Sequence, residues 1–110
     1  MNRVDFFLWT VEKNISKKLY TDNMCRLEQI EHSITYCDLE EEYYKDRCET
    51  IISLFKNLGR NEKMASRHIG NLPIGKTYIS SYTSAIRKYV LSMDFTTEKI
   101  NKQLRTKQNL

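Results

Sequence analysis

The chain has 110 residues, of which 40% are hydrophobic. It contains 18 Lys and Arg and 14 Asp and Glu, which gives a formal net charge of +4. This composition suits one folded domain and excludes an intrinsically disordered chain. Only three Gly and one Pro interrupt it, which predicts an all-α fold. No apolar run approaches the roughly 18 residues of a membrane span, so we expect a cytoplasmic protein that does not engage a membrane.

A first helix is predicted from Arg3 to Asn14. Five apolar residues are spaced so that they lie on one side of this helix, which we expect to face the core: Val4, Phe7, Leu8, Val11 and Ile15. Phe6 and Trp9 widen this side until the helix is apolar almost all round. We therefore expect it to be deeply buried or to pack against a partner.

A second helix is predicted to begin at Ser16, a good N-cap, and to end near Ile34. Its core positions step by three and four residues through Tyr20, Met24, Leu27, Ile30 and Ile34. Lys17 and Lys18 occupy the first turn, where the helix dipole disfavours cations. Either an approaching phosphate offsets that cost, or both side chains are simply solvated.

A long third helix is predicted from Asp38 to Leu58, with a capping-box-like start and a stop at Gly59. Its apolar positions are Leu39, Tyr43, Cys48, Ile51, Leu54, Phe55 and Leu58. The consecutive Glu40, Glu41 and Glu42 fan out around a helix instead of converging, so we interpret them as a solvated cap and not as a metal or acid–base site.

The stretch from Arg60 to Gly75 lacks periodicity and is predicted to be a loop with a helical turn near Glu62–His68; loops of this length are often functional. Within it, Gly70–Thr77 spells G-x-x-x-x-G-K-[ST], the phosphate-cradling pattern in which Lys76 reaches phosphates and Thr77 holds magnesium. That geometry needs a buried strand before the first glycine, and the polar residues before Gly70 do not supply one. We interpret the segment as a loop punctuated by Gly and Pro and keep nucleotide binding as a third alternative.

The last long helix is predicted from Lys76 to Met93, with a core face at Ile79, Tyr82, Ile86, Tyr89, Val90 and Met93. After Asp94 and Phe95, Thr96 or Thr97 is expected to cap a short basic helix that ends at Leu104. The chain then divides into a helical domain, residues 1–95, and a basic tail or linker, residues 96–110. Such a linker would lead to a C-terminal domain that this chain lacks.

The reactive side chains show no catalytic constellation. Cys25, Cys37 and Cys48 are widely spaced and odd in number, which indicates free thiols in a reducing compartment. With His32 and His68 they form none of the close ligand pairs of a zinc site. No nucleophile with a base and no paired acids can be recognised. We therefore expect no metal, no cofactor and no enzymatic activity.

The charges are divided unevenly along the chain. Residues 1–58 hold eight Lys and Arg against eleven Asp and Glu, a net charge of −3, whereas residues 59–110 hold ten against three, a net charge of +7. Such an asymmetry suggests a polyanionic partner for the basic half. The alternative is a solvated surface that ends in a basic tail.

The run from Tyr78 to Val90, YISSYTSAIRKYV, resembles the last helix of the core-binding (SAM-like) domain of phage integrases, the tyrosine recombinases. That helix has the pattern Y-x-S-A-[LI]-R-x-[FY]. The aromatic opening Phe6–Trp9, followed by Ser16, Tyr20 and Leu27, is similar to the start of the same domain. A similar helical module accompanies some restriction-type nucleases. The resemblance covers residues 4–93, departs from the pattern in the long third helix and in the Arg60–Gly75 insertion, and includes no recombinase catalytic domain.

This resemblance implies a SAM-like orthogonal bundle of four or five helices from a phage or mobile element, a non-catalytic module that binds double-stranded DNA with its second and fourth helices. By position it makes Lys17, Lys18, Arg87 and Lys88 candidate phosphate contacts, with Ser80, Ser81 and Ser84 as neutral partners. Arg87 and Lys88 also lie outside the core stripe of their own helix. Further cations that could extend the DNA-binding surface are Arg60, Lys63, Arg67 and Lys76.

The competing interpretation is a small protein-interaction module or inhibitor, encoded by a host or a phage. It is favoured by the aromatic first helix and by an acidic surface that a nucleic-acid-binding protein would recognise, formed by Glu40, Glu41, Glu42, Asp46 and Glu49. Salt-sensitive binding to random DNA distinguishes the two interpretations.

Overall fold

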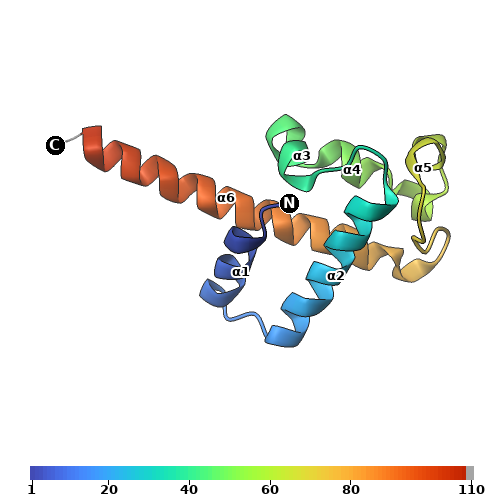
Figure 1. The fold of residues 1–110 in the computed structure, drawn as a ribbon, viewed down its shortest axis with the longest axis horizontal. Coiled ribbons are helices and arrows are strands. Elements are labelled where there is room, and N and C mark those ends of the chain that lie inside the picture. The colour runs from blue at the N-terminus through green and yellow to red at the C-terminus, as the bar shows by residue number, and fades with distance from the viewer. Residues whose placement is uncertain (109–110) are drawn as a thin grey trace.

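The computed structural model describes residues 1–108, with side chains described as far as Arg105, and these residues form helices without strands (Figure 1). The predicted all-α class is confirmed for this part of the chain. The α-helices are α1 (Arg3–Glu12), α2 (Lys17–Ser33), α3 (Leu39–Asp46), α4 (Glu49–Ser53), α5 (Glu62–Arg67) and α6 (Ser80–Gln108). Two short 3₁₀ helices, Lys56–Gly59 and Thr77–Ile79, precede α5 and α6.

Helix α6 is the element around which the others pack. It runs the length of the molecule, with α1 on one side, α3 and α4 on the other, and α2 crossing it (Figure 1). Its predicted core face is confirmed, because Ile79, Tyr82, Ile86, Tyr89, Val90 and Met93 are all buried. Helix α2 also begins and ends close to the predicted positions, and the Ser16 hydroxyl accepts the N–H of Leu19 as its N-cap.

Helix α1 buries the opposite side from the one predicted. Phe6, Trp9 and Thr10 face the core, whereas Val4, Phe7, Leu8 and Val11 are exposed; of the predicted face only Ile15, just after the helix, is half-buried. Both sides of this helix are apolar, so periodicity alone cannot choose between them. Aromatic packing decides, because the Phe6 ring lies about 6 Å from the rings of Trp9, Tyr20 and Tyr89.

The prediction of one continuous third helix from Asp38 to Leu58 is wrong, because this segment forms two helices, α3 and α4. The backbone turns left-handed at Arg47 and Cys48, with φ of 55° and 64°, and this separates α3 from α4. Two contacts stabilise the turn. Nε and Nη2 of Arg47 donate hydrogen bonds to the two carboxylate oxygens of Asp94, and the buried Cys48 thiol lies 3.6 Å from the carbonyl oxygen of Leu39. Leu58, predicted to face the core, sits in a second left-handed turn and is partly exposed.

The separate short helix predicted after Phe95 is also wrong, because α6 continues through Asp94 and Phe95 without a break. No Gly or Pro stands there to end the helix. The hydroxyl of Thr96 donates to the carbonyl of Ser92 one turn earlier instead of capping a new helix. Asn109 and Leu110 of the predicted tail lie outside the described residues. Within residues 1–108, no helix combines the length and the apolar character needed to cross a membrane.

Candidate nucleic-acid interface

The loop between α5 and α6 is tied to the C-terminal end of α2. Ile34 and His68 form an isolated antiparallel bridge. In it, the backbone N–H of Thr35 donates to the carbonyl oxygen of Arg67, and the backbone N–H of Ile69 donates to the carbonyl oxygen of Ser33. The guanidinium of Arg67 adds hydrogen bonds to the carbonyl oxygen of Thr35, from Nη2 at 2.8 Å and from Nε at 3.3 Å. The loop is therefore held as a fixed part of the surface.

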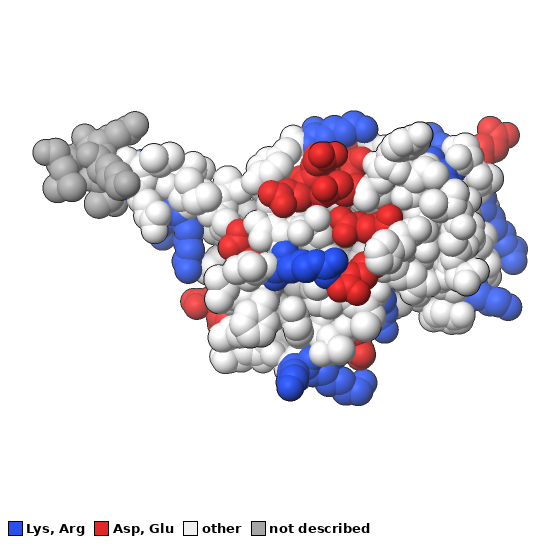
Figure 2. Space-filling view, in the orientation of Figure 1, with Lys and Arg blue, Asp and Glu red and all other residues white. Residues whose placement is uncertain are grey.

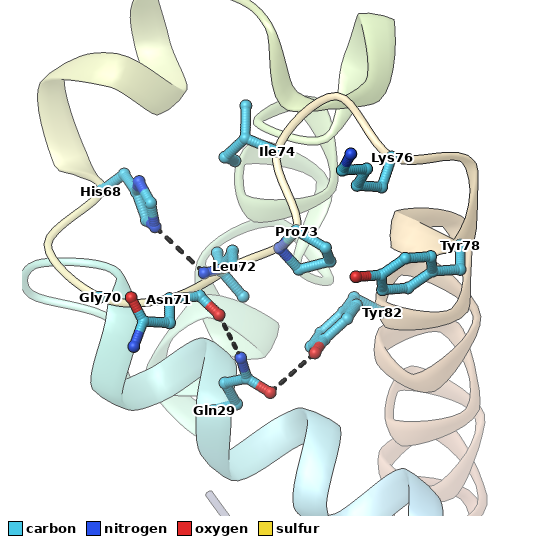
Figure 3. A pocket seen from close by; sticks show the side chains of 10 residues that line it. All are labelled: Gln29, His68, Gly70, Asn71, Leu72, Pro73, Ile74, Lys76, Tyr78 and Tyr82. Carbon is cyan, nitrogen blue, oxygen red and sulfur yellow. Dashed lines mark hydrogen bonds between the residues drawn. The ribbon is translucent and has the colours of Figure 1, made fainter.

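This loop forms one wall of an open groove with a volume of about 720 Å³ (Figure 3). The N–H of Leu72 donates to His68 Nε2 at 3.2 Å, the Gln29 amide donates to the Asn71 carbonyl, and the Tyr82 hydroxyl donates to Gln29 Oε1 at 2.7 Å. These bonds connect the loop, α2 and α6 across the floor of the groove. The groove is lined by Gln29, His68, Gly70, Asn71, Leu72, Pro73, Ile74, Lys76, Tyr78 and Tyr82.

Both glycines of the phosphate-loop-like pattern have a packing explanation. A Cβ on Gly70 would lie 2.4 Å from the hydroxyl oxygen and 2.8 Å from the Cβ of Ser33, which is buried at the end of α2. Gly75 has a φ of +81°, and a Cβ there would lie 2.5 Å from Nε of Arg60. Each glycine thus makes room for a neighbouring side chain of this protein.

The backbone of the same segment does not form a phosphate cradle. Such a cradle points several free N–H groups at the ligand, but here the N–H groups of Leu72, Ile74, Gly75 and Lys76 donate within the protein. The N–H of Gly75, for example, donates to the Leu58 carbonyl at 2.7 Å. The short helix α5 precedes the segment and a 3₁₀ helix follows it. The geometry does not match that of the nucleotide-binding loop.

Four exposed cations lie in this loop or in the segment before it: Lys56 begins the 3₁₀ helix before α5, Arg60 follows that helix and packs against Gly75, Lys63 shares a hollow with Lys56, and Lys76 lines the groove. Glu62 is the only acidic residue between Glu49 and Asp94 in the sequence, so little negative charge offsets them. We call Lys56, Arg60, Lys63 and Lys76 the basic end of the molecule.

The eight predicted DNA contacts do not form one surface. At the basic end, Arg60 packs against Gly75, which precedes Lys76, and Lys63 shares a hollow with Lys56. Arg67 lies beside them, half-buried, with its guanidinium on backbone carbonyls. Lys17 and Lys18 lie at the opposite end of α2, roughly 24 Å along the helix from the bridge at its C-terminus.

The other two predicted contacts lie on α6. Arg87 lines a separate hollow with Arg47 and Glu49, and Lys88 is half-buried. Arg87 and Lys88 therefore do not extend the basic end but sit farther along the helix. Lys18 is engaged by Asp22, one turn later in α2, at 3.3 Å.

Sequence reasoning missed two members of this site. A helix that continued from Asp38 to Leu58 would hold Lys56 in its last turn, but the chain turns at the 3₁₀ helix Lys56–Gly59 and Lys56 lines one hollow with Lys63. The sequence predicts Tyr78 near the start of a packed helix, but its side chain is 62% exposed and lines the groove. The left-handed backbone at Asn57 and Leu58 turns the chain after Lys56. Asn57 is a residue type that favours this conformation, but the apolar spacing that continues to Leu58 predicts an unbroken helix.

The acidic side chains gather elsewhere, over α3 and the neighbouring surface (Figure 2). Within the predicted acidic surface, Glu41 and Glu49 are exposed and Glu40 is half-buried. Glu42 is buried, and Asp46 accepts the N–H of Thr50 at 3.1 Å. The charge asymmetry of the sequence thus becomes a spatial separation between α3 and the basic end.

The described residues hold no group of three or more His, Cys, Asp or Glu that could bind a metal ion. Burial raises the pKa of the Cys48 thiol to about 12. Burial and then the charge of Glu31 raise the pKa of Cys37 to about 12 as well. Thiols held in the protonated form are poor nucleophiles, so neither cysteine resembles a reactive centre.

In comparisons with models of known protein families, with curated proteins and with solved structures, no match to this chain was found.

Proposed function

We propose that the protein is a non-catalytic helical module that binds duplex DNA by contacting phosphates through its basic end. The observation that carries this proposal is the gathering of Lys56, Arg60, Lys63 and Lys76 around one fixed loop, with Glu62 as their only acidic neighbour in the sequence from residue 50 to residue 93. Lys and Arg that contact phosphates supply affinity without sequence selectivity.

The packing of the loop supports this function. Cations bind a rigid polyanion best when their backbone is already ordered, because less conformational entropy is lost on binding. The bridge between Ile34 and His68, together with the bonds from Arg67 to Thr35, supplies that order. We assign to Arg67 a positioning role in the loop.

On the resemblance alone, we further propose that the module is of the recombinase core-binding or restriction-associated type. In that arrangement α2 and α6 would face the duplex, and Lys17, Lys18, Arg87 and Lys88 would add contacts. The orthogonal, SAM-like arrangement of the helices is part of this finer proposal.

Fluorescence anisotropy with a random duplex of about 25 base pairs tests the basic end. Four phosphate contacts should give a plot of log affinity against log salt with a slope of about −3.6. Arg60→Ala/Lys63→Ala should weaken binding and make the slope shallower by about two units. Lys13→Ala/Lys45→Ala removes the same charge at two exposed positions outside both proposed DNA-contacting surfaces and is the matched control.

Equal losses in these two double variants would show that net charge alone drives binding and would overturn the assignment to the basic end. Absence of binding at low salt would overturn DNA binding itself. A third variant, Arg87→Ala/Lys88→Ala, tests the finer proposal: a loss as large as that of Arg60→Ala/Lys63→Ala would support docking of recombinase type.

A second candidate function is a protein-interaction module or inhibitor, which the acidic surface over α3 favours (Figure 2). Its cations would then serve only solubility. Under this function, Glu41→Lys/Glu49→Lys should abolish binding to a basic protein partner, while DNA should not bind at any salt concentration.

A further inference from the structure

The side of α1 that faces away from the core is apolar. Val4, Phe7, Leu8 and Val11 follow the spacing of one helical face, and exposed fractions reach 71% at Val4 and 56% at Leu8. Contiguous exposed apolar surface on a soluble protein marks an interaction site. The acidic Asp5 and Glu12 lie beside Leu8 on this helix, three residues before it and four residues after it.

A second apolar stripe lies on α6 where the helix leaves the body of the molecule (Figure 1). Ile100 and Leu104 continue the helical spacing of the core residues Ile86 and Met93, but they are 52% and 53% exposed. The core face of α6 therefore extends beyond the part of the protein that covers it. Lys99 and Arg105 stand next to these two side chains in sequence.

A hollow of about 330 Å³ separates the two stripes, with Leu8 on one wall and Ile100 on the other. Asp5 and Lys99 also line it. The stripes thus border one surface without closing on each other. Asp5 and Glu12 on the α1 stripe and Lys99 and Arg105 on the α6 stripe carry opposite charges, so these side chains are complementary in charge while both stripes are apolar.

We propose that this surface is the interface of a homodimer, in which the projecting end of α6 from each copy packs on the outer face of α1 of the other. A twofold axis makes such a contact reciprocal, so the same two stripes are used twice and the assembly closes at two copies. Residues 96–108 extend roughly 20 Å along the helix axis. Two helix contacts of this length are of the scale of the roughly 800 Å² per partner that a stable interface buries.

We assign a second copy of the chain to this surface, because each chain carries both complementary surfaces, the outer face of α1 and the projecting end of α6. Charge complementarity between α1, with Asp5 and Glu12, and the end of α6, with Lys99 and Arg105, needs no other molecule. The basic end around α5 lies at the opposite end of α6 and stays exposed in this dimer (Figure 1). Dimerisation would therefore present two basic ends, and the proposal does not depend on DNA binding.

Sedimentation equilibrium of the full chain tests the dimer. The wild-type protein should sediment as a dimer at micromolar concentration, and Leu104→Glu and Val11→Glu should each raise the dimer dissociation constant by at least roughly tenfold. Ile69→Glu is the matched control, because Ile69 is an apolar residue at the other end of the molecule that is at least as exposed as Leu104 and Val11. Circular dichroism should show unchanged helix content in all three variants.

A charge-reversal mixture tests whether the contact is reciprocal. Glu12→Lys and Arg105→Glu alone each place like charges in both contacts, so each variant should dimerise more weakly than the wild type. Mixed together, they form a heterodimer in which both contacts again pair opposite charges, and dimerisation should recover. A monomeric wild-type protein, an assembly larger than a dimer, or a mixture without recovery would each overturn the proposal.

Discussion

The guanidinium of Arg60 lies directly against Gly75: a Cβ built on that glycine would fall 2.5 Å from Arg60 Nε and 2.6 Å from Nη2. The second glycine of the G-x-x-x-x-G-K-[ST] pattern thus has a role in this protein that involves no nucleotide. It adopts a backbone conformation that favours glycine, with φ of +81°, and it leaves room for one of the cations of the basic end.

Gly75→Ala should therefore affect both stability and DNA affinity. The left-handed backbone is strained for a residue with a Cβ, which costs about 1 kcal/mol, and the new methyl group displaces Arg60. Thermal unfolding measures the first effect and anisotropy with duplex DNA the second. Adding Arg60→Ala to this variant should cause little further loss of DNA affinity. If Arg60→Ala reduced the affinity as much in this variant as it does in the wild type, the link between the two residues would be contradicted.

Gly70→Ala should be more damaging to the fold than Gly75→Ala. Its Cβ would meet the buried Ser33 at 2.4 to 3.0 Å, and both the end of α2 and the loop would have to shift. We expect a loss of about 1–3 kcal/mol in the free energy of unfolding, as for other overpacked sites. In urea titrations, Ser33→Gly/Gly70→Ala should lose less than the two single changes added together. Strict additivity would show that the predicted clash does not occur.

Asp94 should make stability depend on pH. Partial burial alone would raise the pKa of this carboxyl group, but hydrogen bonds from Arg47 and Tyr43 outweigh it and hold the pKa below its ordinary value of 3.8. A lowered pKa stabilises the folded protein above about pH 4, and this contribution is lost as the pH falls through the lowered value. Asp94→Asn should therefore be less stable than the wild type at pH 7, and the difference should shrink between pH 5 and pH 2.

Urea unfolding of both proteins across that pH range measures the effect of Asp94. Asp38 accounts for part of the acid sensitivity that remains in the variant. Burial raises its pKa too, but hydrogen bonds from the Met1 amino group and from the N–H of Glu40 lower it overall. A constant difference between wild type and Asp94→Asn at all pH values would contradict the prediction.

The three cysteines should differ in their reaction with iodoacetamide. Cys25 is exposed, whereas burial raises the pKa values of Cys37 and Cys48 from 9.0 to about 12. Three pKa units reduce the thiolate fraction about a thousandfold at pH 8, so the half-buried Cys37 should react slowly and the buried Cys48 only as fast as the protein opens. Mass spectrometry of the labelled peptides reads each site, and the chain in urea is the reference. Rapid labelling of Cys48 in the native state would contradict its burial.

Core faces could be predicted for helices that have one apolar side and one polar side. The core faces of α2 and α6 could be read from three- and four-residue spacings because polar residues separate the apolar ones. Helix α1 could not be read in this way, since Phe6 and Trp9 compete with Phe7 and Leu8 for the core. The spacing fits both sides, and only contacts with Tyr20 and Tyr89 choose one.

The break between α3 and α4 was hidden for a different reason. Left-handed turns usually show as Gly or Asn, but here Arg47 and Cys48 adopt them because tertiary contacts to Asp94 and Leu39 stabilise the turn. The turn at the site was hidden differently: Asn57 favours a left-handed backbone, but the apolar spacing up to Leu58 favours a continuous helix. Sequence reasoning found Arg60, Lys63 and Lys76 by their charge, but the left-handed Asn57 and Leu58 place Lys56 beside them.

The most direct test of the basic end is a map of DNA contacts on the intact chain. In ¹H–¹⁵N correlation spectra recorded with increasing amounts of a random duplex, the amide signals of Arg60, Lys63 and Lys76 should shift most. Signals of α1 should move little. If the largest shifts instead fall on Lys17 and Lys18, or if no signal moves at low salt, the basic end is not a DNA-binding surface.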